Sequence, residues 1–412
     1  MSKTESSIIS DNELYSFNKS GSGSCHILYD LANWKNGLAF KNIDFSPTGK
    51  PVIKIAELND GIGPTTAYTE KEYPKEVYLQ KGDFLFSWSG NPQTSIDIYK
   101  FRMQEGWLNQ HIFKVIPNEK LVHRDFFFYL MKALKPNFTK IATNKQTTGL
   151  GHVTIADLKR LEVTIPDYNK QKKIAQILLS LDEKIELNNV INRNLEEQAQ
   201  AIFMSWFIDF EPFGGEMPSD WTIGKLIELC DFQEGYVNPA QTHNEFFDGN
   251  VKWLRAVDIN ESFIIETSRT LTTAGFESAG KSALLFKPNT IAISKSGTIG
   301  RLGIVADYMC GNRAVIDIAP RSEINLSFIH QYLKLHQSEF PDLAVGSVQK
   351  NLYISILENL DIIIPTEKTL YSFANILDPI YKQMKCLCQE ASNLKIIRDS
   401  LLPKLMSGEL SH

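Results

Sequence analysis

The chain has 412 residues, 43% of them hydrophobic and 22% charged, with a formal net charge of −5, a composition typical of a globular protein with two or three domains. It contains no apolar run long enough to cross a bilayer, and it begins without a signal-peptide pattern, so we expect no membrane association. Five scattered cysteines predict a cytoplasmic location rather than a disulfide framework, and the slightly acidic charge does not exclude nucleic-acid binding.

The chain begins with a polar, serine-rich stretch, and we expect residues 1–24 to form a flexible tail. A mixed segment follows, in which short apolar runs end in loops. The run 82-GDFLFSWSG-90 is typical of a strand entering a Ser-Gly loop, 125-DFFFYLMKAL-134 is helical by length, and 161-LEVTIP-166 is a strand closed by proline. These patterns predict a compact α+β domain over residues 25–166.

The same order of segments recurs roughly 200 residues later. The stretch 143-TNKQTTGLGHVTIADLKRLEVTIPD-167 aligns without a gap with 342-DLAVGSVQKNLYISILENLDIIIPT-366, and five further segment pairs align in the same order with small changes in loop length. Such ordered similarity indicates a tandem duplication. The sequence therefore predicts a second domain of the same fold over residues 214–365.

Each domain is followed by a helical pattern, over residues 167–213 and 366–412, with Asp167 and Thr366 suited to cap the helix starts. Apolar residues recur there with alternating steps of three and four, which predicts that the two helices pack together. The predicted seam contains Leu178, Leu181, Ile185, Leu195 and Ile202 on the first helix and Leu377, Ile380, Met384, Leu394 and Leu401 on the second.

Asn188 and Asn192 interrupt the seam of the first helix, and Arg398 interrupts that of the second. The predicted fold is α+β: two duplicated α/β domains separated by an antiparallel two-helix coiled coil, with pseudo-twofold symmetry. The alternative is that each helix packs on its own domain as an ordinary core helix. A protein with two similar domains at a fixed separation suits DNA that carries two half-sites.

The segments around the helices resemble the conserved regions of a known family. These segments are 171-QKKIAQILLSLDEKIELNN-189, 217-MPSDWTIGKLIEL-229 and 398-RDSLLPKLMSGEL-410. They are similar to those of the specificity (S) subunit of type I restriction–modification systems, from about Cys25 onwards. The start of the chain departs from this pattern, because the first domain has no tryptophan corresponding to Trp221.

The resemblance implies a non-catalytic subunit with two target-recognition domains, each reading one half of a bipartite, asymmetric sequence in double-stranded DNA. The helices would set the unread spacer and recruit two modification (methyltransferase) subunits, which restriction subunits then join. It further implies that S-adenosylmethionine, ATP and Mg²⁺ bind to those partners and that this chain binds no cofactor itself.

Three pairs of loops carry candidate DNA contacts: 87–94 with 294–301, 107–111 with 310–314, and 143–149 with 346–351. Lysine and arginine suit phosphate and guanine, asparagine and glutamine suit adenine edges, serine suits phosphate, and an exposed tryptophan can stack. The candidates are Trp88, Ser89, Asn91, Gln93, Asn109, Gln110, Lys145, Gln146, Lys295, Ser296, Arg301, Asn312, Arg313, Gln349 and Lys350.

The residues give no support for catalysis or a metal site. The stretches 91-NPQT-94 and 238-NPAQ-241 lack the second proline and the aromatic residue of an amino-methyltransferase loop. Asp167, Asp182 and Lys184 mimic a nuclease motif, but helix rise places them roughly 20 Å apart. The remaining alternatives are a stand-alone bipartite DNA-binding scaffold or repressor and a protein–protein adaptor built on the coiled coil.

Overall fold

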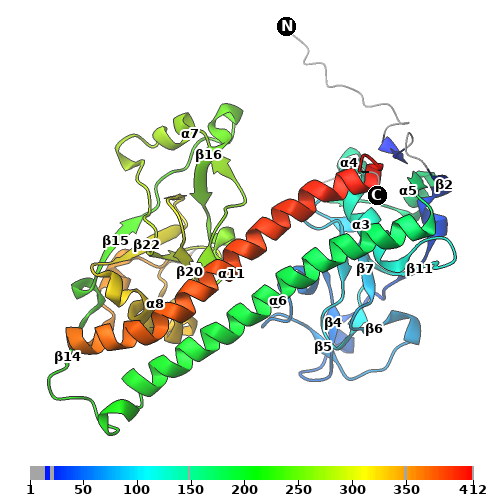
Figure 1. The fold of residues 1–412 in the computed structure, drawn as a ribbon. Coiled ribbons are helices and arrows are strands. Elements are labelled where there is room, and N and C mark those ends of the chain that lie inside the picture. The colour runs from blue at the N-terminus through cyan, green and yellow to red at the C-terminus, as the bar shows by residue number, and fades with distance from the viewer. Residues whose placement is uncertain (1–13, 19–22, 147–148, 348–349, 411–412) are drawn as a thin grey trace. The chain divides into compact units, whose positions relative to one another are not determined.

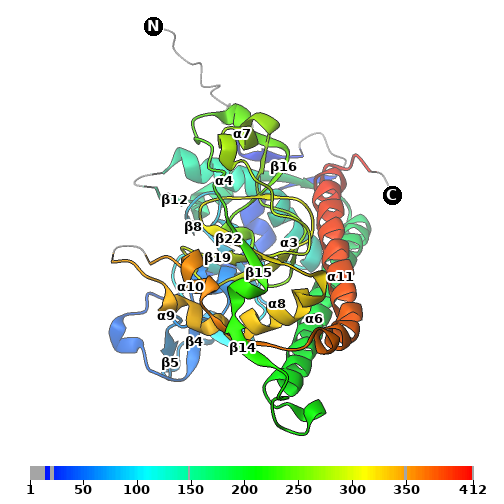
Figure 2. The same cartoon turned by 90° about the vertical axis from the view of Figure 1, so that its left-hand side faces the viewer.

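The computed structural model describes residues 14–18, 23–146, 149–347 and 350–410 (Figures 1 and 2). The chain forms two compact units, one made of Met1–Asp182 with Ile397–His412 and the other of Glu183–Ile396. We call the part of the first unit that precedes the long helix α6 domain 1, and the part of the second unit between the long helices domain 2. Among the described residues, no helix is long and apolar enough to cross a membrane.

Domain 1 is built on two four-stranded sheets, ordered β3-β11-β7-β9 and β5-β4-β10-β6, and a three-stranded sheet β1-β13-β2. Its strands are β1 (Ser16–Phe17), β2 (Ser24–Ile27), β3 (Ala32–Asn36), β4 (Lys50–Ile53), β5 (Tyr68–Thr69), β6 (Tyr78–Gln80), β7 (Phe84–Ser87), β8 (Ser89–Gly90), β9 (Asp97–Lys100), β10 (Glu105–Leu108), β11 (Ile112–Pro117), β12 (Gly151–His152) and β13 (Glu162–Ile165). Its α-helices are α2 (Ile55–Asp60), α3 (Arg124–Ala133), α4 (Lys135–Asn144) and α5 (Ile155–Arg160).

Domain 2 contains a five-stranded sheet ordered β15-β22-β19-β20-β17, a three-stranded sheet β18-β16-β21 and the pair β14-β23. Its strands are β14 (Thr222–Lys225), β15 (Cys230–Glu234), β16 (Phe247–Leu254), β17 (Phe263–Ile264), β18 (Thr270–Leu271), β19 (Ile291–Ser294), β20 (Leu302–Val305), β21 (Cys310–Gly311), β22 (Val315–Pro320) and β23 (Asp361–Ile364). Its α-helices are α7 (Thr273–Glu277), α8 (Leu326–Leu335), α9 (Phe340–Leu343) and α10 (Ile354–Glu358).

The central strand of each domain separates two cores, because successive side chains of a strand point to opposite faces. In β7, Phe84 and Phe86 pack with the residues of α3, whereas Leu85 packs with Trp107 on the other face. In β19, alternate residues are likewise divided between two clusters. This explains why both strands read as continuous apolar runs rather than as alternating ones.

The strand pairings confirm the duplication. The pair β7 with β11 corresponds to β19 with β22, and the parallel pair β4 with β10 corresponds to β16 with β21. In the parallel pairs, Val52 lies opposite Trp107 in domain 1, and Trp253 lies opposite Cys310 in domain 2. Each domain thus buries one tryptophan in its parallel strand pair. The tryptophan of domain 1 lies on the second strand of the pair, β10, whereas that of domain 2 lies on the first, β16.

The flexible tail predicted for residues 1–24 extends too far along the chain, because residues 14–18 are folded. Leu14 and Tyr15 are buried, and β1 pairs in parallel with β13. Asn18 donates a hydrogen bond through Nδ2 to the carbonyl oxygen of Met406, at 2.9 Å. Residues 14–18 are therefore part of the folded first unit, because they extend a sheet and cover its core, whereas residues 1–13 and 19–22 lie outside the described chain.

The long helices α6 (Tyr168–Phe207) and α11 (Glu367–Ser407) begin directly after the predicted capping residues. The Oδ1 atom of Asp167 accepts a hydrogen bond from the Lys170 amide at 3.1 Å, and Oγ1 of Thr366 accepts one from the Thr369 amide at 3.4 Å. Asp167 is thus occupied as a cap, which accounts for one member of the apparent nuclease motif.

The two helices run antiparallel within each unit, and each also packs on a domain core. In the first unit, Ile174 and Leu178 of α6 share a cluster with Leu405 of α11 and the core of domain 1. In the second, Phe203 of α6 shares a cluster with Phe373 of α11 and the core of domain 2. The two packing modes that the sequence presented as alternatives therefore occur together.

The predicted seam residues are all at least half-buried. Leu178, Ile185, Leu377 and Met384 are buried, and Leu181, Leu195, Ile202, Ile380, Leu394 and Leu401 are intermediate. Arg398, the charged seam position, donates from Nη1 to Asp182 Oδ1 at 2.7 Å, and the Tyr129 hydroxyl donates to Asp182 Oδ2 at 2.6 Å. Asp182 therefore joins α6 to α11 and α3 in the first unit.

Candidate nucleic-acid interface

Two predicted loops of domain 1, 87–94 and 107–111, meet the segment that follows the third, 143–149, at the backbone of Trp88, directly after β7. The amide of Trp88 donates to the carbonyl oxygen of His111 at 3.1 Å, and the Val153 amide donates to the carbonyl oxygen of Trp88 at 2.8 Å. The next residues pair as β8 with β12. We call this meeting point the three-loop junction of domain 1.

The Trp88 indole is half-buried and fixed by its neighbours. Its Nε1 donates to Asn36 Oδ1 at 3.2 Å, and its ring centroid lies 5.1 Å from that of His111 and 6.0 Å from that of His152. Burial, and secondarily the neighbouring His152, lower the pKa of His111. The lowered pKa favours the neutral imidazole of His111 beside the Trp88 ring, and such an aromatic surface suits contact with a base or a thymine methyl group.

Domain 2 contains the same junction with different side chains. The Lys295 amide donates to the carbonyl oxygen of Ala314 at 2.8 Å, and the Leu352 amide donates to that of Lys295 at 2.9 Å. Nζ of Lys295 forms an ion pair with Glu234 and lies 5.9 Å from the centroid of the Tyr353 ring. Burial, followed by the nearby positive charge of Arg313, lowers the pKa of Lys295.

The alignment places Trp88 opposite Lys295 and Asn36 opposite Glu234. In both domains, the side chain at the junction is therefore tied to the last residue of the same edge strand, β3 or β15. The backbone hydrogen bonds are retained, and the interacting pair is replaced as a unit. The two domains therefore share the backbone geometry of the junction and differ in the side chains that it carries.

The other candidates of domain 1 differ in how free their side chains are. Asn91 is exposed, but its Oδ1 accepts from the Gln93 amide at 2.9 Å and so shapes its own turn. Lys145 forms an ion pair with the buried Asp157, so its charge is neutralised within the domain. Gln93, Gln110 and Gln146 are exposed, Asn109 is half-buried and Ser89 is buried.

In domain 2, Arg313 is exposed beside the junction, and the described residues provide no ion-pair partner for it. Asn312 is half-buried, and its Oδ1 accepts from the Ala314 amide at 3.0 Å, which shapes the turn. Ser296 and Arg301 are half-buried and Lys350 is exposed. Gln349 lies outside the described residues.

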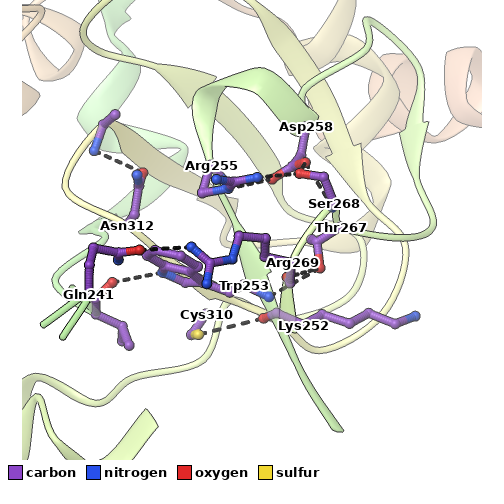
Figure 3. Close-up of polar contacts among 12 residues, drawn as sticks. Gln241, Lys252, Trp253, Arg255, Asp258, Thr267, Ser268, Arg269, Cys310 and Asn312 are labelled. Atoms are coloured by element: carbon purple, nitrogen blue, oxygen red, sulfur yellow. Dashed lines mark hydrogen bonds and ion pairs between the residues drawn. The ribbon is translucent and has the colours of Figure 1, made fainter. Parts of the chain in front are cut away.

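An arginine–aromatic cluster in domain 2 was missed by the sequence analysis (Figure 3). The Arg269 guanidinium lies 4.0 Å from the Phe247 ring centroid and 6.0 Å from that of Trp253, and its Nη1 donates to Gln241 Oε1 at 2.8 Å. The Arg255 guanidinium also lies near this group, 5.5 Å from the Trp253 ring centroid.

This cluster adjoins the predicted loop 310–314, because the Asn312 amide donates to the carbonyl oxygen of Leu254 at 2.9 Å and Trp253 pairs with Cys310 (Figure 3). Arg255 also contacts the carboxylate of Asp258, at 3.6 Å, whereas the partners of Arg269 among the described residues are the amide of Gln241 and the rings of Phe247 and Trp253. An arginine oriented by ring stacking and lacking a carboxylate partner suits phosphate or guanine. The only local signal was the basic residue that follows the strand 253-WL-254.

Among the described residues, no group of three or more histidine, cysteine, aspartate or glutamate side chains gathers as a metal site. Asp182 and Asp167, which resembled parts of a nuclease, are both engaged in helix packing and capping. The candidate site is a polar and aromatic surface built on strand ends.

Comparison with known proteins identifies the family. The model of the "type I restriction modification DNA specificity domain" family matches residues 27–197 and again residues 218–394. The chain is 26% identical over 406 residues to the type I restriction enzyme HindI specificity subunit of Haemophilus influenzae, covering 81% of this chain and 87% of the relative. It is 26% identical over 426 residues to the type I restriction enzyme MjaIX specificity subunit of Methanocaldococcus jannaschii, covering 92% and 97%.

Among solved structures, the S subunit of a type I restriction–modification system from M. genitalium has a similar fold. It aligns with a TM-score of 0.53 at 18% identity, covering 94% of this chain and 97% of that one. Since the family model matches most of the chain in two successive copies that share their strand pairings, the chain belongs to the family of type I restriction–modification DNA specificity proteins.

Proposed function

We propose that this chain is the DNA sequence-recognition subunit of a type I restriction–modification complex, with each domain reading one half of a bipartite, asymmetric site. The observation that carries the proposal is the three-loop junction, whose backbone is retained in both domains while its side-chain pair changes from Trp88–Asn36 to Lys295–Glu234. A duplicated reader with different contact chemistry in each copy is suited to two different half-sites.

The long helices are proposed to recruit two modification subunits, with restriction subunits joining afterwards. Both helices expose large apolar side chains within the second unit, among them Leu187 at 52% and Ile396 at 60% relative exposure. A partner that covers these side chains gains hydrophobic stabilisation. In this assembly the chain itself takes no part in methyl transfer or cleavage, and the partners bind S-adenosylmethionine, ATP and Mg²⁺ in the cytoplasm.

A domain replacement tests the proposal. The chain and a variant in which residues 25–166 come from another member of the family are each co-expressed with the modification subunit, and methylated positions are mapped across the host genome. We expect the variant to change one half of the methylated site and to retain the other half and the spacer. A variant that changes both halves, or methylation without a bipartite pattern, would contradict the proposal.

The same preparation separates this function from a stand-alone bipartite repressor. A repressor binds its operator without other subunits, whereas we expect tight, sequence-specific binding by this chain only in complex with the modification subunit. Equal affinity for the selected duplex with and without that subunit would favour the repressor.

A further inference from the structure

The folded N-terminal segment, residues 14–18, precedes the region that the family model matches, which begins at residue 27. Leu14 and Tyr15 are 7% and 8% exposed, and Asn137 Nδ2 donates to the carbonyl oxygen of Leu14 at 3.1 Å. The Arg160 guanidinium lies 4.0 Å from the Tyr15 ring centroid. These contacts fix the tyrosine and direct its hydroxyl group into domain 1.

That hydroxyl donates to a buried carboxylate that also holds the loop from Lys145 to Thr154, which overlaps the third predicted loop. Asp157 is 1% exposed, and its Oδ1 accepts from Tyr15 at 2.8 Å and from Nζ of Lys145. Its Oδ2 accepts from both the amide and the hydroxyl of Thr154, each at 2.7 Å. Lys145 and Thr154 lie at opposite ends of the loop, so one carboxylate ties both ends together.

The loop held in this way reaches the three-loop junction. It contains β12, which pairs with β8, and Val153, whose amide donates to the carbonyl oxygen of Trp88. The path from Tyr15 to Trp88 therefore consists of a buried hydrogen-bonded carboxylate followed by a backbone hydrogen bond. A shift of the loop changes the position of the aromatic surface at the junction.

Domain 2 lacks this arrangement. The alignment places Ile356 opposite Asp157, Ala344 opposite Lys145 and Tyr353 opposite Thr154. The strand pair β14-β23, which corresponds to β2-β13, has no described third strand in the position of β1. A change at Asp157 is therefore expected to affect one half-site only.

We propose that Asp157, held by Tyr15 of the N-terminal segment, is a positioning residue that sets β12 and Val153 against β8 and Trp88 and thereby determines how strictly domain 1 reads its half-site; this rests on the proposed function. Asp157 does not touch DNA in this scheme. It acts through the loop, and residues 14–18 are an added part of the first reading domain that the second domain does without.

The test uses the full chain co-purified with its modification subunit and a double-stranded oligonucleotide library randomised over both half-sites. Bound sequences are selected and the base preference of each half is scored for the parent, Tyr15→Phe, Asp157→Asn and Tyr129→Phe. The last variant is a matched control, because Tyr129 also donates its hydroxyl to a carboxylate in the first unit, that of Asp182, away from the loop.

We expect Tyr15→Phe to weaken discrimination in the half-site of domain 1 about tenfold, as the loss of one hydrogen bond to a charged group implies, with a larger effect for Asp157→Asn. The other half-site and the control stay at parental preference. Tyr15→Phe removes a single oxygen atom and keeps the ring packing, so the test does not depend on Asp157→Asn folding.

The inference is overturned if Tyr15→Phe keeps the parental base preference in both half-sites. It is also overturned if discrimination falls equally in the two half-sites, or if Tyr129→Phe causes the same loss, since both results indicate a merely structural role. A parent that selects no bipartite sequence overturns the proposed function and the inference together. The two failures are therefore distinguishable.

Discussion

At the scale of single residues, the duplication shows that side chains at equivalent positions were replaced in interacting pairs. Asn36 with Trp88 corresponds to Glu234 with Lys295 at the junction. The ion pair between Lys114 and Asp83 in domain 1 corresponds to a hydrogen bond between Asp317 and Thr290 in domain 2. Because a buried polar group without its partner is costly, a substitution that removes the hydrogen-bonding or charged group of one member alone is expected to lower stability.

The Lys295–Glu234 pair gives a prediction about binding. Lys295→Met leaves the Glu234 carboxylate uncompensated beside the proposed DNA surface, so we expect DNA affinity to fall about fivefold at low salt, an effect of about 1 kcal/mol. Adding Glu234→Gln removes the repulsive charge, so the double variant recovers most of the affinity.

The measurement is a double-mutant cycle on the selected duplex at two salt concentrations. Independent, additive effects of the two substitutions would show that the pair does not act as a unit.

Asp317 gives a prediction about pH. Burial raises its pKa to about 7, so the folded protein holds this carboxyl group neutral at pH values where the unfolded chain ionises it. Its contribution to stability is complete below the ordinary carboxyl pKa near 4 and is lost as the pH rises through about 7. We expect Asp317→Asn to raise the Tm relative to the parent by several degrees at pH 8 and to have little effect at pH 4.

Thermal unfolding at a series of pH values tests this expectation, and the difference in Tm between variant and parent is the quantity to follow. A difference that stays constant between pH 4 and pH 8 would mean that Asp317 ionises normally in the folded protein.

At the scale of elements, the long helices carry polar residues where a coiled coil prefers apolar ones. Asn188 is fully buried and Asn192 is 7% exposed; their Nδ2 atoms donate to Glu390 Oε2 at 2.8 Å and to Cys388 Sγ at 3.1 Å. The Oδ1 atoms of both are buried and have no hydrogen-bond partner in the part of the chain that the structure describes. Polar seam residues of this kind favour one helix register at a cost in stability.

We therefore expect the double variant Asn188→Leu, Asn192→Leu to unfold at a higher temperature than the parent, by several degrees, because two buried polar groups are replaced by apolar ones. Calorimetry of the full chain measures this change, and Leu195→Met serves as a control for altered packing in the same seam. A lower Tm would show that the asparagines stabilise the helix pair.

At the scale of the whole molecule, the features that the sequence analysis predicted correctly are those with a local or repeated signal. Apolar spacing located α6 and α11, capping residues gave their starts, and the aligned segments gave the duplication. The segment 14–18 was missed because LYSF is too short to show a period, and its pairing with β13 is distant in sequence. Lys145 remains a candidate DNA contact, but its ion pair with Asp157 could not be predicted, because the two residues come together only once the loop folds back.

Candidate contacts were harder to predict than elements, since a polar loop residue can serve its own turn or a ligand equally well. Asn91 and Asn312 shape their turns through the side-chain oxygen. The arginine–aromatic cluster was missed because Phe247, Trp253 and Arg269 are separated in sequence and are brought together only by strand pairing.

The opposite placement of the buried indoles, Trp107 across from Val52 and Trp253 across from Cys310, limits how the two halves of the gene can exchange segments. A crossover that moved one of these strands without its neighbour would set two tryptophans against each other in one product and leave valine facing cysteine in the other. The first product is overpacked and the second contains a cavity. Viable recombinants should therefore have breakpoints outside the paired strands, so that inheritance proceeds by whole domains.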